Sequence, residues 1–125
     1  MTRLALGLSL AALALVTAAC SGSGSDPSGA PASVPPDATV IVAKDLAFSP
    51  TEVTVPADEP VTIVLDNQED VPHNIQVKDA AGADIFTGEI INKGQVDNDL
   101  PALAAGSYPF ICQVHPDMKG TITAS

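Results

Sequence analysis

The sequence is poor in aromatic and basic residues. The first shortage limits the composition of the core, and the second limits the classes of binding partner. Aromatic residues make up only 3% of the chain and Trp is absent, so a core must rest on Val, Ile, Leu, Ala and a few Phe. The five Lys and Arg are outnumbered by 15 Asp and Glu, which gives a net charge of −10. Such an acidic chain repels nucleic acid and anionic lipid surfaces. The negative charge suits a partner with a positive docking face. Alternatively, it serves only to keep the protein soluble.

Cysteine and histidine are also scarce, with two of each in 125 residues. This length predicts a single domain. Cys20 and Cys112 could pair as a disulfide, but Cys20 ends an apolar leader and Cys112 lies in a cluster of possible ligands. Without that disulfide, Cys112 would be a free thiol in an exported protein, and such a thiol usually has a specific function.

The amino terminus has the pattern of an export signal. Arg3 precedes an uncharged run over residues 4–19, which is shorter than the roughly 20 residues that span a bilayer and fits a signal peptide. Residues 16–20 read VTAAC, which resembles a bacterial lipobox, where the chain is cut before a Cys that is then lipidated. We predict a signal peptide over 1–19 and a lipidated Cys20 at the outer face of the cell membrane. The alternatives are ordinary cleavage after an Ala, which would leave the protein periplasmic or extracellular, and a retained anchor.

Residues 20–38 are predicted to link this anchor to the folded domain. After Cys20 they read SGSGSDPSGAPASVPPDA, which has too little apolar surface to offset the entropy lost on ordering. A flexible chain of this length reaches on the order of 20–25 Å. An anchored domain would therefore move in the space just above the membrane, whereas without lipidation the segment is a plain disordered terminus.

The remaining residues, 39–125, have the pattern of short β-strands separated by Pro and Gly. We predict strands at 39–43, 52–55, 61–65, 74–78, 85–91, 108–114 and 120–123. No long run with helical periodicity is present, and 101–105 predicts one helical turn or a loop. The expected fold is an all-β sandwich or barrel of about seven or eight strands.

Alternation along the strand at 108–114 assigns its side chains to two faces. Tyr108, Phe110 and Cys112 share the face that we expect to point inward. Pro109 lies on the other face and has no backbone N–H to donate, so the strand is expected to be near an edge or its start at that point.

Residues 110–120, which read FICQVHPDMKG, contain three possible metal ligands. Cys112, His115 and Met118 follow one another at steps of three. A thiolate, an imidazole and a thioether are soft or borderline donors, which together favour copper over magnesium, calcium or manganese. The segment therefore predicts a copper site.

Two further features would complete such a site. Three ligands so close in sequence can surround one ion only if the chain turns sharply, and Pro116 and Gly120 suit a turn. A trigonal copper site also needs a second imidazole. His73, in the sequence DVPHN, is the only other histidine, so we expect it to lie beside the first three ligands.

As a whole, residues 39–125 resemble the cupredoxins, small blue copper proteins of the plastocyanin, pseudoazurin and amicyanin type. The spacing Cys-x-x-His-x-x-Met is similar to that of pseudoazurin and amicyanin rather than to the longer plastocyanin loop. The resemblance implies a Greek-key fold. It extends over both halves of the domain, through Phe48-Ser49-Pro50, Val53-Thr54-Val55, Val61-Thr62-Ile63, Asn67 and Pro72-His73-Asn74, and through Gly106-Ser107-Tyr108, Phe110, Cys112, His115, Pro116, Met118 and Gly120.

The resemblance also implies a role for each residue of the site. Cys112 is the thiolate ligand with a short bond, and His73 and His115 are the imidazoles in the same plane. Met118 is the weak axial ligand that helps set the potential. Asn74 makes a hydrogen bond that locks the two ligand-bearing segments together. The implied cofactor is one copper ion that alternates between Cu(I) and Cu(II).

Four protein ligands leave no strong open position for a substrate, so we predict an electron carrier rather than an enzyme. His115, between Val114 and Pro116, is the expected electron port of a monomeric protein. The expected redox partner is a c-type cytochrome or an oxidase domain with a positive face.

Three alternatives use the same ligands. Copper storage or delivery at the cell envelope is the main one, although the chain has no Met-rich or His-rich surface. A structural zinc site is disfavoured because it has no use for an axial Met118. A fragment of a multicopper enzyme would need further His ligands, and none remain.

Overall fold

The structure is a computed structural model that describes residues 38–125. The predicted signal peptide over 1–19, the predicted lipidation site Cys20 and the linker as far as residue 37 lie outside the described residues. Within 38–125, no helix has the length and apolar character needed to cross a membrane.

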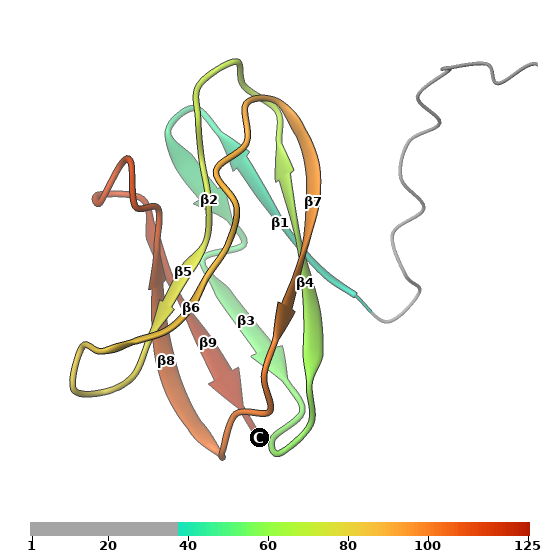
Figure 1. The fold of residues 1–125 in the computed structure, drawn as a ribbon, viewed down its shortest axis with the longest axis vertical. Helices are drawn as coiled ribbons and strands as arrows, with labels where there is room; N and C mark the ends of the chain where they lie inside the picture. The colour runs from blue at the N-terminus through green and yellow to red at the C-terminus, as the bar shows by residue number, and fades with distance from the viewer. Residues whose placement is uncertain (1–37) are drawn as a thin grey trace, which may run out of the picture.

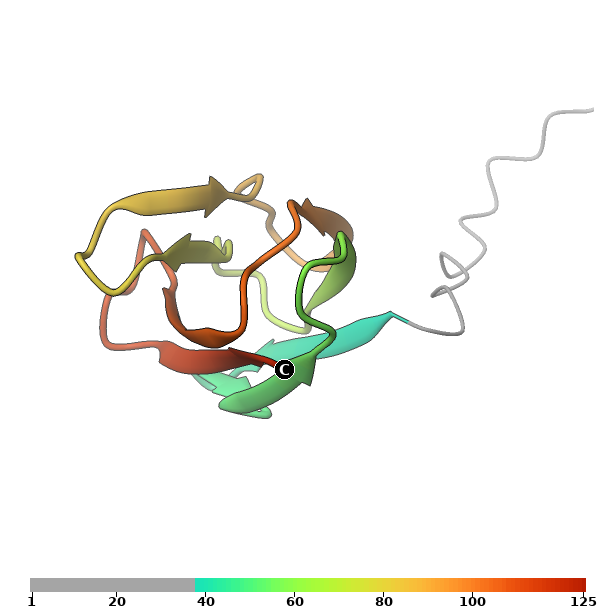
Figure 2. The ribbon, with the colours of Figure 1, turned by 90° about the horizontal axis from the view of Figure 1, so that it is seen from below.

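Two β-sheets packed face to face form the domain, which confirms the predicted all-β sandwich (Figure 1). One sheet has the strand order β2-β1-β4-β7, and the other has the order β3-β9-β8-β5-β6. Seen from below, the strands surround one interior (Figure 2). The strands are β1 (Thr39–Lys44), β2 (Ala47–Ser49), β3 (Glu52–Val55), β4 (Val61–Asn67), β5 (Gln76–Lys78), β6 (Asp84–Thr87), β7 (Gly94–Leu100), β8 (Gly106–Ile111) and β9 (Lys119–Ala124).

The pairing of β5 with β8 decides which loops meet. These two strands are antiparallel neighbours, with Gln76 opposite Ile111. The residues just before β5 and just after β8 therefore meet at the same end of the sheet, although the two strands are far apart in sequence. Parallel pairing occurs only between β1 and β4 and between β3 and β9 among the described strands.

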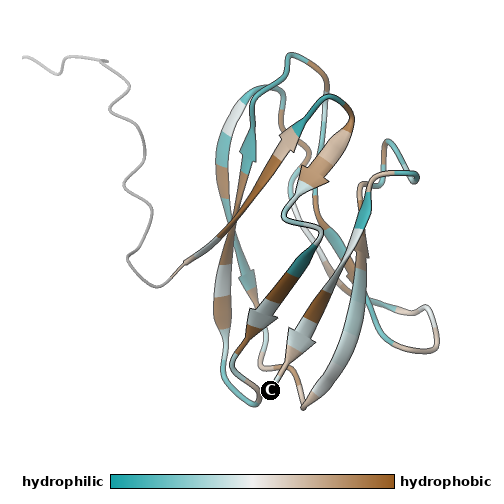
Figure 3. Ribbon diagram, turned by 180° about the vertical axis from the view of Figure 1, so that it is seen from behind, coloured by the Kyte–Doolittle hydropathy of each residue, from teal (hydrophilic) through white to brown (hydrophobic). Residues whose placement is uncertain are grey.

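The core consists of side chains that both sheets direct inward. Apolar and polar residues alternate along several strands (Figure 3), as expected where one strand face is buried and the other meets solvent. Phe48 and Phe110, from different sheets, have ring centroids 5.3 Å apart. The core comprises Ile41, Ala43, Phe48, Val53, Val55, Ile63, Leu65, Ile75, Val77, Leu100, Leu103, Phe110, Cys112, Met118, Ile122 and Ala124.

The sequence analysis did not predict two of the observed strands, β2 and β7. β2 has only three residues and β7 reads GQVDNDL, so neither shows a clear apolar pattern. Both are edge strands of the four-stranded sheet, where backbone pairing with one neighbour and a few inward contacts are enough. Residues 101–105, for which a helical turn or a loop was expected, form a loop.

The positions of Pro109 and Gly120 also differ in part from those expected from the sequence. β8 lies inside its sheet, but β5 pairs only with Phe110 and Ile111, so Pro109 has a partner on the β9 side alone. The missing N–H of Pro109 therefore costs no bond to β5. Gly120, which was expected to help the ligand loop turn, instead lies in β9.

Candidate metal centre

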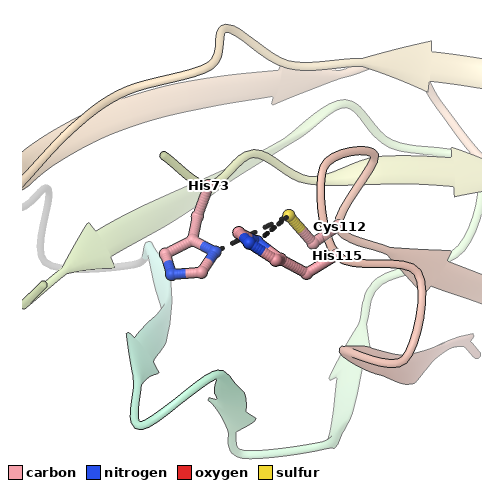
Figure 4. A group of neighbouring side chains, drawn as sticks. All are labelled: His73, Cys112 and His115. Carbon is pink, nitrogen blue, oxygen red and sulfur yellow. Dashed lines mark hydrogen bonds between the residues drawn. The ribbon is translucent and has the colours of Figure 1, made fainter. Parts of the chain in front are cut away.

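Cys112 is the first residue after β8, and its side chain is buried at the end of the core. Its Sγ atom lies 3.7 Å from Nδ1 of His73 and 3.9 Å from Nδ1 of His115. Both imidazoles turn toward the sulfur from different segments of the chain (Figure 4). One donor atom from each of the three residues lies within 4.8 Å of the others, so one ion can contact all three.

His73 is held in place through its own backbone. It precedes β5 and forms an isolated β-bridge with Ile91, in which each backbone N–H donates to the other residue's carbonyl, at 3.0 and 2.9 Å. The side chain is fully buried. Nδ1 faces Cys112, whereas no hydrogen bond within residues 38–125 satisfies the buried Nε2. A buried, unpartnered ring nitrogen is unusual in a folded protein and needs an explanation.

The loop between β8 and β9 carries the other two predicted ligands. The N–H of Cys112 donates to the carbonyl of Met118 at 2.9 Å, and the N–H of Met118 donates to the carbonyl of His115 at 2.9 Å. These bonds close the loop into a compact turn. Met118 is buried in the core, whereas His115 is only partly buried. The four predicted ligands thus lie at one end of the sandwich, three of them as a cluster of donor atoms.

Asn74 joins the two segments that carry these residues. Its Oδ1 accepts the backbone N–H of Gln113 at 2.9 Å, and its Nδ2 donates to Oε1 of Gln113 at 3.1 Å and to the carbonyl of Gly88 at 3.0 Å. Asn74 follows His73 and Gln113 follows Cys112. The side chain of Asn74 therefore restrains the distance between the two ligand segments.

One acidic side chain near the cluster was not singled out by sequence reasoning. Glu69 places Oε1 3.3 Å from Nε2 of His73. This distance is within ion-pair range, although the pair forms no hydrogen bond in this structure. The spacing of four residues between Glu69 and His73 would bring them together on a helix, but in this loop only the tertiary structure does so.

Comparison with known proteins identifies the family. Residues 9–124 match the family model of the cupredoxin-like domain. The amicyanin of Paracoccus versutus is 38% identical over 94 residues, which cover 74% of this chain and 69% of that protein. Amicyanin-alpha of Methylorubrum extorquens is 30% identical over 123 residues, which cover 98% of both proteins.

Solved structures agree with this result. The crystal structure of amicyanin from Paracoccus versutus superposes with a TM-score of 0.62 and 31% identity, covering 75% of this chain and 87% of that chain. The reduced auracyanin of Roseiflexus castenholzii has a TM-score of 0.62 at 23% identity, covering 71% and 97%, and supports the fold alone. On the match to the family model and the two curated relatives, this chain belongs to the cupredoxin family.

Proposed function

We propose that this protein is a type 1 copper protein that carries single electrons at the cell envelope, with His73, Cys112, His115 and Met118 as its ligands. The observation that carries the proposal is the placement of one buried sulfur beside two imidazole nitrogens. Membership of the cupredoxin family supports it.

The distances between the donor atoms fit a bound metal ion. Bonds of about 2.0 Å to nitrogen and about 2.3 Å to sulfur, the lengths found for zinc, would hold the two atoms about 3.7 Å apart at trigonal angles. The observed sulfur–nitrogen separations are 3.7 and 3.9 Å. The thiolate of Cys112 and a thioether in the same loop favour copper over zinc. The residues present therefore suit copper.

When bound, copper supplies a one-electron couple between Cu(I) and Cu(II). The protein contributes shielding and rigidity. Cys112, His73 and Met118 are buried, so they keep water away from most of the site. The bonds within the ligand loop and across Asn74 restrain the donor atoms, which limits rearrangement when the charge changes. With four side chains assigned as ligands, no strong position is left for a substrate, which suits a carrier and not an enzyme.

Three exposed apolar residues belong to segments that carry or contact the predicted ligands or Glu69, and they suit a docking partner. We define the apolar patch as Leu46, Ile90 and Val114, the large apolar residues that are most exposed within 38–125, at 55%, 49% and 39%. Val114 adjoins His115, and Ile90 adjoins Ile91, the bridge partner of His73. Exposed apolar residues beside a functional site commonly mark a protein interface. Electrons would pass through the ring of His115.

The charge of the protein suggests the kind of partner. Without the predicted signal peptide, four Lys stand against 15 acidic residues, a formal charge of −11. On the strands β4 and β7, the side chains of Asp66, Asp97 and Asp99 add to this negative field. A redox protein with a positive docking face, such as a c-type cytochrome or an oxidase domain, would be attracted electrostatically. The protein itself is proposed to act as a monomer.

The proposed location follows from the amino-terminal sequence. A signal peptide over 1–19 would export the chain, and lipidation of Cys20 would anchor it at the outer face of the membrane. Expression of the full chain in a bacterial host tests this step. Wild-type protein should fractionate with membranes and carry acyl chains by mass spectrometry, whereas Cys20→Ser should be soluble. Equal distribution of the two proteins would refute the anchor.

The copper site is tested by colour. Purified protein loaded with Cu(II) should show the intense visible absorption of a thiolate–copper bond, and Cys112→Ser should abolish it. Colour that survives this substitution would refute the assignment. To separate a carrier from a copper delivery protein, the loaded protein is mixed with a chelator and cycled electrochemically. Slow copper loss with reversible cycling supports the carrier, and rapid loss without cycling supports delivery.

A further inference from the structure

The buried ring of His73 has two nitrogens with different surroundings. Nδ1 lies 3.7 Å from Sγ of Cys112, and Nε2 lies 3.3 Å from Oε1 of Glu69. Within residues 38–125, Nε2 is the only buried side-chain nitrogen or oxygen that has no hydrogen-bond partner. Glu69 is thus placed beside the one buried side-chain atom of the described residues that has no hydrogen-bond partner.

The chemistry of imidazole makes this contact informative. A neutral imidazole has one N–H, and the nitrogen that binds a metal must be the unprotonated one. If Nδ1 of His73 binds the metal, the proton is on Nε2, where it is buried. An N–H in this position needs an acceptor, and a carboxylate that accepts a hydrogen bond from it also fixes the ring orientation and raises the basicity of the ligand.

The carboxylate of Glu69 is itself fixed. Its Oε1 accepts the backbone N–H of Leu46 at 3.0 Å, from the turn between β1 and β2. The backbone N–H of Glu69 donates to Oδ1 of Asn67 at 2.9 Å, and its carbonyl accepts the N–H of Lys93 at 3.0 Å. Contacts from the β1–β2 turn, from the neighbouring Asn67 and from Lys93 therefore hold Glu69, with Oε1 3.3 Å from Nε2 of His73.

We propose that Glu69 is a positioning residue of the metal centre. Its carboxylate accepts a hydrogen bond from the Nε2–H of His73, keeps Nδ1 directed at the sulfur of Cys112, and places a negative charge next to the ligand shell. This charge favours the more highly charged oxidised ion, so it strengthens Cu(II) binding and lowers the reduction potential. The same carboxylate accepts the backbone N–H of Leu46, so Glu69 contacts both His73 and a residue of the apolar patch. The inference rests on the proposed copper function.

Asp70 provides a matched control. It is the next residue and also acidic, but its side chain is 87% exposed and its nearest charged partner is Lys93, 3.9 Å away, whereas the side chain of Glu69 is 19% exposed. Asp70→Asn therefore removes one charge close to the site without touching His73. Glu69→Gln removes the charge but keeps an acceptor oxygen, and Glu69→Leu removes both.

Three measurements test the inference. In metal-free protein, the ¹⁵N shifts of the His73 ring should show the proton on Nε2, and Glu69→Leu should give a mixture of both tautomers. By chelator competition, Glu69→Leu should weaken Cu(II) binding by about 10-fold to 100-fold, the usual effect of losing such a contact. Glu69→Gln should raise the reduction potential clearly more than Asp70→Asn does.

The outcomes separate the two proposals. If wild-type protein forms the coloured copper site but Glu69→Leu and Glu69→Gln match Asp70→Asn in affinity and potential, the role of Glu69 is refuted and the copper function stands. If wild-type protein forms no coloured site, both fail. If Glu69→Leu does not fold, the potential of Glu69→Gln alone decides, and a value equal to that of Asp70→Asn refutes the inference.

Discussion

Gly120 in β9 lies directly opposite Phe110 in β8, and the space between them has no room for a side chain. A Cβ atom at Gly120 would lie 2.3 Å from Cζ of Phe110 and 2.4 Å from the carbonyl oxygen of Thr51. The ring of Phe110 packs against Phe48 in the core. This close approach lets β9 return to the sheet directly after the ligand loop.

We predict that Gly120→Ala destabilises the metal-free protein by about 1–3 kcal/mol, because the ring or the backbone must shift to admit the methyl group. Gly106→Ala is the matched control, since its Cβ would meet nothing closer than 3.7 Å and should change stability by no more than about 1 kcal/mol. Urea unfolding followed by circular dichroism measures both. Equal stabilities of the two variants would contradict the packing argument.

Asn74 is predicted to stabilise the fold as well as the site. Asn74→Ala removes the bonds to Gln113 and Gly88 and leaves a backbone N–H and a carbonyl without partners, which should cost about 2–3 kcal/mol. Gln113→Ala removes only the side-chain bond at 3.1 Å and should cost less than about 1 kcal/mol. Urea unfolding of the metal-free variants tests this. A loss for Asn74→Ala no greater than for Gln113→Ala would show that the bond between segments is unimportant.

The apolar patch yields a prediction about electron transfer. Val114→Asp should slow the reaction with a basic c-type cytochrome on the order of tenfold, a change of about 1.4 kcal/mol, because a charge is placed where an apolar contact forms. Thr54→Asp adds the same charge at an exposed position of β3 and should leave the rate unchanged or raise it slightly. Stopped-flow mixing measures both rates. If Val114→Asp is as fast as Thr54→Asp, docking occurs elsewhere.

Metal binding should raise the thermal stability of the whole domain. A ligand that binds only the folded state adds about 2.7 kcal/mol when its free concentration is 100 times its Kd, which corresponds to about 10 °C or more for a domain of this size. Calorimetry with and without copper should show this increase for wild-type protein and not for Cys112→Ser. A similar increase in the variant would indicate that copper binds elsewhere.

Much of the fold was predictable because several of its strands have strong patterns. The runs at 52–55 and 61–65 contain β-branched residues that recur where the structure has β3 and β4. β2 and β7 were missed because β2 has only three residues and β7, which reads GQVDNDL, shows no clear apolar pattern. Gly120 was misread because the sequence cannot distinguish a glycine that permits a turn from one that permits close packing.

The site was predictable to different degrees. Cys112, His115 and Met118 are recognisable from local spacing, and His73 was chosen because no other histidine exists. Glu69 had no such signal. Its contact with His73 depends on how the loop after β4 folds, which a local pattern does not specify.

By itself, the sequence determined the chemical type of the donors, the all-β class and the family, because these depend on residue identity and short-range periodicity. Only the tertiary structure decided that Nδ1 of His73 lies beside the sulfur of Cys112 and that a carboxylate lies behind the same ring. The physical reason for the first placement is the antiparallel pairing of β5 with β8, whereas the second depends on the loop after β4. This pairing joins segments that are 39 residues apart, and it depends on the packing of the whole core.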